Sequence, residues 1–145
     1  MLVSEILAAK SRPLVTATVD MIIPAAMDLL LIHKISCLPV LSYDRLVGIV
    51  SDKDIFALVH REPDNFRERK VWDIMTQNVM TALPSDEIYQ VAAIMTRYRF
   101  RHMPVVKDEQ VVGLVSIGDI VKAQLDSMAD ENHHLRRYIA GEYPG

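Results

Sequence analysis

Apolar positions along the chain change their spacing in the same order twice. In the second half, one face of a helix is predicted by Ile88, Val91, Ala92 and Met95. Ser85 or Asp86 is the expected N-cap of that helix. Two short apolar runs follow at 103–106 and 111–115, joined by a polar turn, and they predict a strand hairpin. Another helix is expected to begin near Ile117.

The first half repeats this order. An extended piece at 14–17 precedes a helix at 21–34, whose Pro24 is tolerated because it lies in the first turn. Strands are predicted at 38–41 and 46–50, and a second helix near Asp52. Each half therefore reads as a β-α-β-β-α unit.

The two units are copies of one another. An offset of 65 residues aligns segment 16–55 with segment 81–120 without a gap, and it superposes Pro39 on Pro104, Gly48 on Gly113 and Ser51 on Ser116. Residues 71–75 match residues 3–7 at an offset of 68, so each copy also has a short helical lead-in. One unit alone would leave a sheet face poorly covered. The fold class expected is therefore α+β (α/β-type), with two pseudo-symmetric repeats packed sheet to sheet.

Composition narrows the possible classes. The 145 residues are 50% hydrophobic and 24% charged, as in a globular protein, and the net charge of −3 gives no argument for nucleic acid. Polar residues interrupt every long apolar stretch and no signal peptide is seen, so we expect no membrane span and a cytoplasmic location. The single cysteine, Cys37, fits a reducing compartment and a buried apolar position.

Both copies place a Ser-x-x-Asp pattern where a strand meets a helix: Ser51 with Asp54, and Ser116 with Asp119. A hydroxyl and free backbone N–H groups at a helix N-terminus favour phosphate. An ionised Asp one turn along can accept hydrogen bonds from both hydroxyls of a ribose. The alternative is that Ser is an N-cap and Asp a favourable first-turn charge. The two roles are compatible.

These residues resemble the cystathionine-β-synthase (CBS) domain, present as a tandem pair. The resemblance rests on LVTATVD, ISCLPVL and LVGIVSDKDIF in the first copy and on VWDIMTQNVMTALPSD, FRHMPVV and VVGLVSIGDIV in the second. It implies a stand-alone regulatory module that binds AMP, ADP, ATP, NAD(H) or S-adenosylmethionine between the repeats, AMP above all. It also implies a disc-shaped homodimer, an unidentified client protein and no catalysis.

The resemblance also implies contacts to the adenine ring. The family places backbone contacts at Thr16 and Ala17 in one site and at Thr81 and Ala82 in the other. Apolar walls for the base are expected from the pairs Leu38–Pro39 and Met103–Pro104. Ordinary core packing explains these apolar side chains equally well.

The copies differ in charge near the expected phosphate. Arg101 and His102 precede the second Pro, whereas the first copy has no cation there and offers only Lys53 at its helix start. We therefore expect the second motif set to mark the stronger phosphate site, with a solvated basic rim as the alternative. Ser116, His102 and Asp119 lack the pattern of a catalytic triad, and no Cys/His spacing suggests a metal site.

The predicted organisation is repeat 1 at 1–60, a linker at 61–70, repeat 2 at 71–125 and a helical extension and tail at 126–145. The tail helix is expected to break at Gly141 and end by Pro144. It either pairs with another molecule or folds back on its own repeat. The competing function is a ligand-independent interaction module that acts through this helix.

Overall fold

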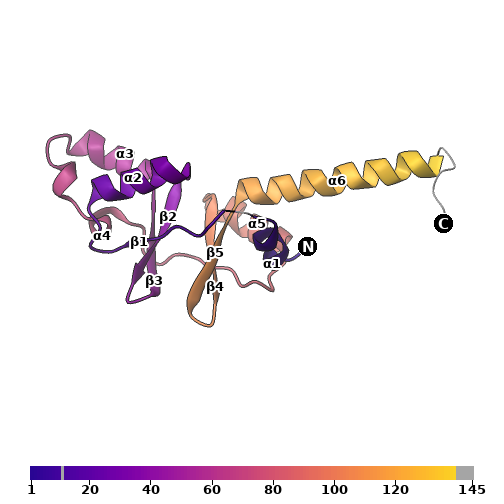
Figure 1. Cartoon of the computed structure of the whole chain (residues 1–145), viewed down its shortest axis with the longest axis horizontal. Helices are drawn as coiled ribbons and strands as arrows, with labels where there is room; N and C mark the ends of the chain where they lie inside the picture. Colours follow the sequence, from indigo (N-terminus) through magenta and orange to yellow (C-terminus); the bar gives the residue numbers. More distant parts are fainter. Residues whose placement is uncertain (11, 140–145) are drawn as a thin grey trace.

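The structure is a computed structural model, and it describes residues 1–10 and 12–139. Two similar halves lie side by side, with their strands at the centre and most helices on the outside (Figure 1). The predicted order of elements is confirmed in the first half, and in the second half apart from its first strand. The predicted fold class is also confirmed, since the two sheets face each other with β3 beside β5.

The first half contains a three-stranded sheet in the order β1-β2-β3. β1 (Ala17–Thr18) pairs in parallel with β2 (Cys37–Ser42), and β2 pairs antiparallel with β3 (Arg45–Ser51). α2 (Ile23–His33) links β1 to β2, and α3 (Asp52–Arg61) follows β3 directly. Helix and strand starts agree with the expectation to within a few residues.

The second half has the same plan with a two-stranded sheet. α5 (Ile88–Tyr98) precedes β4 (His102–Lys107) and β5 (Gln110–Ser116), which pair antiparallel. The counterpart of β1 is reduced to one parallel bridge between Ala82 and Val105.

Both hairpins turn through two residues with positive φ, Tyr43 and Asp44 in the first and Asp108 and Glu109 in the second. Left-handed conformations at both central positions fit the right-handed twist of the flanking strands. The two turns therefore have the same geometry although neither contains glycine.

The predicted N-cap of α5 is wrong. Glu87 occupies the N-cap position, and no side chain caps the helix. The Asp86 carboxylate instead accepts a hydrogen bond from the Leu83 N–H at 2.8 Å, and so shapes the turn before the helix. Ser85 is exposed.

The two lead-in helices are exchanged between the halves. α1 (Val3–Ala9) places Val3 and Ile6 in the core of the second half, while α4 (Val71–Ile74) places Val71 in the core of the first. The linker also contributes to a core, because Phe66 in the 3₁₀ helix Phe66–Glu68 is buried in the first half. Each core is therefore completed by residues that lie outside its own β-α-β-β-α unit.

The absence of a side chain at Gly48 and Gly113 allows the lead-in segments to approach the sheets closely. A Cβ at Gly48 would lie 2.7 Å from Met75 Sδ and 2.8 Å from the Thr76 carbonyl oxygen. A Cβ at Gly113 would lie 2.6 Å from Leu7 Cδ2. Both glycines are therefore required for close packing and not for a special backbone angle.

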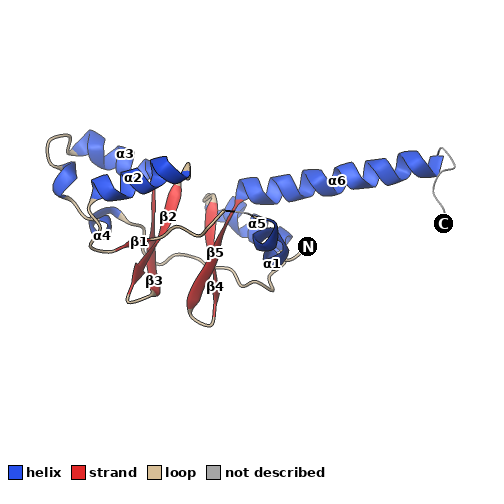
Figure 2. Cartoon of the chain, in the orientation of Figure 1, coloured by secondary structure: helices blue, strands red, loops and turns tan. Residues whose placement is uncertain are grey.

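α6 (Ile117–Ile139) begins against the second core at Ile120 and then extends well away from both halves (Figure 2). From Leu125 to His133 every residue is exposed. The expected break at Gly141 and end at Pro144 lie outside the described residues. Within the part of the chain that the structure describes, no helix has the length and apolar content needed to span a membrane.

Candidate functional site

The first Ser-x-x-Asp junction is formed where β3 runs directly into α3. The Asp54 N–H donates to Ser51 Oγ at 3.2 Å, and the Ser51 N–H donates to Asp54 Oδ2 at 2.9 Å. This reciprocal arrangement is a capping box, so the capping role considered for both residues is observed. Ser51 and Asp54 remain partly exposed.

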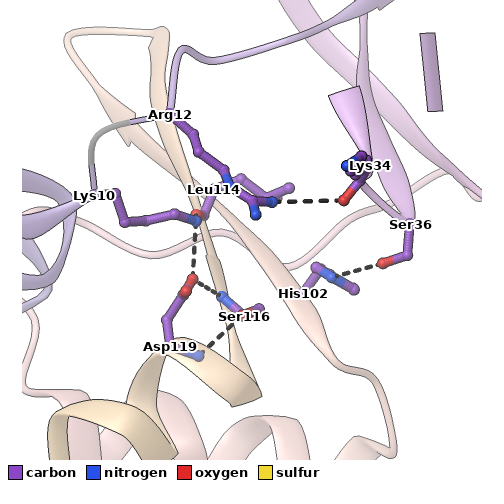
Figure 3. Close-up of polar contacts among 8 residues, drawn as sticks. All are labelled: Lys10, Arg12, Lys34, Ser36, His102, Leu114, Ser116 and Asp119. Carbon is purple, nitrogen blue, oxygen red and sulfur yellow. Dashed lines mark hydrogen bonds and ion pairs between the residues drawn. The ribbon is translucent and has the colours of Figure 1, made fainter. Parts of the chain in front are cut away.

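The second junction, between β5 and α6, has the same internal bonds. The Asp119 N–H donates to Ser116 Oγ at 3.0 Å, and the Ser116 N–H donates to Asp119 Oδ2 at 2.9 Å. It differs in one respect, because Lys10 Nζ lies 2.9 Å from Asp119 Oδ2 and donates to the Leu114 carbonyl oxygen at 2.8 Å (Figure 3). Burial disfavours the charged carboxylate, but the hydrogen bonds from Lys10 and Ser116 hold the pKa of Asp119 below its usual range.

A cavity of about 680 Å³ opens beside the first junction, a volume typical of small-molecule sites. Ser51 and Asp54 line it from the first half, and Arg101 and His102 line it from the second. The segment between α4 and the second half closes a further side. The other lining residues are Ser36, Cys37, Ile49, Asp52, Lys53, Phe56, Thr76, Asn78, Val79, Met80, Arg99 and Phe100.

His102 connects the two halves. Its Nε2 lies 3.1 Å from Ser36 Oγ across the boundary (Figure 3). Burial lowers the pKa of His102 below its ordinary value; the charge of Asp119 opposes the shift and that of Lys10 adds to it. His102 is therefore a neutral donor or acceptor near pH 7, and an anion in the cavity would favour its protonated form.

Arg101 and His102 were expected to mark the second junction as the stronger phosphate site, but they do not lie at that junction alone. Arg101 and His102 line the cavity of Ser51 and Asp54, together with Lys53. His102 also faces the second junction, because it pairs with Ser116 in the β4–β5 ladder. Arg101 and His102 therefore belong to a shared boundary between the halves.

None of the residues expected at the adenine ring lines this cavity. Ala17, Leu38, Ala82 and Met103 are almost completely buried in the two cores. Both backbone groups of Ala82 are also engaged with β4, since its N–H donates to the Pro104 carbonyl oxygen and its own carbonyl accepts from Val106. Core packing, the alternative left open for these side chains, is what the structure shows. Of the remaining four residues of the set, Pro39 and Pro104 are buried, Thr16 is half-buried and Thr81 is exposed.

Several lining residues were not identified from the sequence. Ser36, Arg99, Asn78 and Met80 carry no recognisable motif: Ser36 and Arg99 each lie between a helix and the strand that follows it, and Asn78 and Met80 lie in the segment after α4 that crosses between the halves. Lys10, which lies at the second junction, is associated with a feature that is visible in the sequence. The lead-in copies match at an offset of 68 and the rest at 65, so the first copy holds three extra residues (68 − 65) between its lead-in and Thr16.

Two other kinds of chemistry were tested. Among residues 1–10 and 12–139, no three His, Cys, Asp or Glu side chains are grouped in a way that could hold a metal ion. Cys37 is buried, and burial raises the pKa of its thiol to about 12, so the thiolate nucleophile is not available at neutral pH.

A family model, the CBS domain, matches this chain twice, over residues 3–61 and 71–126. The chain is 35% identical over 100 residues to the CBS domain-containing protein CBSX3, mitochondrial, of Arabidopsis thaliana, a match covering 68% of this chain and 48% of the relative. It thus spans about half the length of that relative, and about a quarter or less of the L-aspartate semialdehyde sulfurtransferase and inosine-5'-monophosphate dehydrogenase of Methanocaldococcus jannaschii.

Solved structures of similar chains include two with adenosine ligands. The CBS domain pair of protein MJ0100, in complex with 5'-methylthioadenosine and S-adenosyl-L-methionine, is 33% identical with a TM-score of 0.76, covering 88% of this chain and 98% of that one. CBSX2 in complex with AMP is 25% identical with a TM-score of 0.73, covering 86% of this chain and 97% of that one.

Proposed function

The chain belongs to the CBS domain family, and we propose that it is a regulatory module that binds a phosphate-bearing adenosine ligand, AMP in particular. One observation carries the proposal: the cavity of about 680 Å³ that combines Ser51 and Asp54 of one half with Arg101 and His102 of the other. A ligand that bridges these residues would stabilise one relative arrangement of the halves, and a client protein would respond to that arrangement.

Asp54 is suited to hold the ribose. Its Oδ2 accepts the Ser51 N–H, and within residues 1–10 and 12–139 no donor reaches Oδ1. That oxygen can accept hydrogen bonds from ribose hydroxyls while the capping box keeps the side chain in place. Loss of the carboxylate should therefore weaken the binding of all adenosine ligands, whatever their number of phosphates.

The charge around the cavity favours phosphate. Lys53, Arg99, Arg101 and His102 all line it, against the carboxylates of Asp52 and Asp54. Guanidinium groups bind phosphate oxygens in pairs, and His102 gains a proton more readily beside an anion. This balance favours AMP, the ligand in the CBSX2 complex, over S-adenosyl-L-methionine, a ligand in the MJ0100 complex.

The base would lie against the apolar part of the lining, Ile49, Phe56 and Met80, of which Phe56 is 76% and Met80 40% exposed. Such side chains can stack on the base but form no hydrogen bonds that would select one ligand. We therefore propose that the site accepts several adenosine derivatives. The contacts expected from Thr16, Ala17, Leu38 and Pro39 would be indirect, through the core that supports this wall.

Calorimetric titration with AMP, ATP, NADH and S-adenosyl-L-methionine tests the proposal. We expect AMP to bind the wild type and Asp54→Ala to weaken binding at least tenfold. Asp28→Ala is a matched control, since it removes an exposed carboxylate of α2 that does not line the cavity. The proposal is abandoned if none of the four ligands binds the wild type.

One observation favours the competing function of a ligand-independent interaction module. α6 extends beyond both halves and exposes Leu125 and Met128 by 59% and 58%. A homodimer or a client could cover these side chains. Sedimentation of Leu125→Glu against wild type, with and without AMP, distinguishes the two: a mass change without any nucleotide effect supports the interaction module.

A further inference from the structure

The two Ser-x-x-Asp junctions are chemically unequal because one of them already holds a cation of the chain itself. Lys10 Nζ lies 2.9 Å from Asp119 Oδ2, whereas no lysine or arginine reaches Asp54 within the described residues. The pair is partly shielded, with 30% of the Lys10 side chain and 24% of the Asp119 side chain exposed. The carboxylate that would receive a ribose in the second junction is therefore already charge-paired.

The position of Lys10 is fixed at both ends of its side chain. It is the C-cap of α1, and its N–H donates to the carbonyl oxygens of Ile6 and Leu7 at 3.2 Å. Leu7 in turn packs onto Gly113 of β5. The ammonium then donates to the Leu114 carbonyl at 2.8 Å as well as to Asp119 (Figure 3). A side chain anchored in this way loses little additional freedom when it forms the ion pair.

The corresponding place at the first junction is filled by backbone. Ile49, the equivalent of Leu114, accepts the Thr76 N–H at 2.8 Å and donates to the Thr76 carbonyl at 3.0 Å. The difference follows from the three extra residues of the first lead-in, which give α1 seven residues against four in α4. The longer helix carries Lys10 to the junction, and the shorter one leaves Asp54 open to the cavity.

We propose that Lys10 determines how many ligands the chain binds: it occupies the Asp119 junction as an internal cation and restricts adenosine binding to the Asp54 cavity. This inference rests on the proposed function. Oδ2 of Asp119 accepts from both Lys10 and Ser116, so a ribose would find only Oδ1, on a carboxylate whose charge is already paired and beside an ammonium that the Leu114 carbonyl also holds. One nucleotide per chain is therefore the expected stoichiometry, although the motif occurs twice.

Stoichiometry by calorimetric titration, with AMP and S-adenosyl-L-methionine as separate probes, tests the inference. The wild type should bind one molecule per chain, lose it in Asp54→Ala and keep it unchanged in Asp119→Ala. Lys10→Met, which removes the charge but keeps an apolar stem, should bind two, and Lys10→Met combined with Asp119→Ala should return to one. Lys10→Arg and Lys122→Met, a change of an exposed lysine on α6, should both stay at one.

The outcomes separate this inference from the proposed function. Two molecules per wild-type chain, one of them lost in Asp119→Ala, would overturn the role of Lys10 and leave the proposed function intact. A stoichiometry of one in Lys10→Met would overturn it equally. Binding by Lys10→Met at Asp119 alone, with none by wild type, would support Lys10 as the blocking group and refute the Asp54 cavity as the ligand site.

A measurement without ligand covers the case in which the variant folds but binds no nucleotide. The pKa of Asp119, followed by carboxyl-carbon NMR, should rise in Lys10→Met and stay low in Lys10→Arg, because the lysine hydrogen bond holds it down. An unchanged pKa of Asp119 in a folded Lys10→Met protein would show that the ammonium does not occupy the carboxylate.

Discussion

Replacing the two matched glycines by alanine should give unequal losses of stability. At Gly48 the new methyl group would meet the Thr76 carbonyl oxygen at 2.8 Å as well as Met75 Sδ at 2.7 Å. The Thr76 backbone is held by two hydrogen bonds to Ile49, so it cannot move away without breaking them. At Gly113 the methyl group meets only side-chain atoms of Leu7, which is half-buried and can change rotamer.

The magnitude can be worked from these contacts. Overpacking costs about 1–3 kcal/mol, and each weakened backbone hydrogen bond about 0.5–1.5 kcal/mol. The lower entropy of the unfolded alanine chain offsets about 0.4–1 kcal/mol in both variants. Gly48→Ala should therefore lower the free energy of unfolding by about 2–3 kcal/mol. Gly113→Ala should cost about 1 kcal/mol or less, since an off-rotamer leucine costs about 0.5–1.5 kcal/mol before that offset.

Urea denaturation followed by the fluorescence of Trp72, the single tryptophan, measures both changes. A difference of about 2 kcal/mol also corresponds to a gap of about 4–8 °C in Tm at this chain length. Equal losses in the two variants, or a larger loss at Gly113, would refute the argument that a fixed backbone, and not the apolar contact, decides the cost.

Three further outcomes are expected. Burial lowers the pKa of His102, so the stability that the neutral side chain contributes is complete above about pH 6.5 and is lost as the pH falls toward its folded pKa. His102→Gln should therefore flatten this part of the curve of unfolding free energy against pH, measured by urea titration. Ser51→Ala removes the acceptor for the Asp54 N–H and should cost about 1 kcal/mol of unfolding free energy, with Ser127→Ala, an exposed change on α6, as the control. Cys37, whose pKa is raised to about 12, should react with a thiol reagent at neutral pH only at the rate of unfolding, and fast labelling of the native protein would contradict its burial.

Local pattern was sufficient to predict the elements. Helix starts at Asp52 and Ile117 follow directly from the strand-to-helix change in apolar spacing and from the serine that precedes each. The N-cap of α5 was predicted wrongly because Ser85 and Asp86 are both good capping residues, and here Asp86 is used by the preceding turn. Capping chemistry alone does not decide which of two bonds a carboxylate makes.

The candidate site was predictable only in part. The Ser-x-x-Asp junctions are local, so the sequence identified them, whereas the cavity depends on which segment crosses each junction. Asn78 and Met80 reach it through the path of the chain between the halves, which no periodicity encodes. Lys10 was predictable only in part. The three-residue insertion near it is visible in the sequence, but its contact with Asp119 depends on α1 packing against the second half.

The exchange of α1 and α4 has a consequence for the order of folding. During synthesis, α1 emerges first but finds its partners only when the chain has grown past Ile120, while the earlier half waits for Val71. Contacts over such long separations slow the search for the native state. The first core needs no residue beyond Met75 and can form early, whereas the second core joins Val3 and Ile6 to residues 82–120 and can form only late, so we expect the first half to fold ahead of the second during synthesis. The two copies of one sequence motif are therefore expected to differ in the order in which they fold.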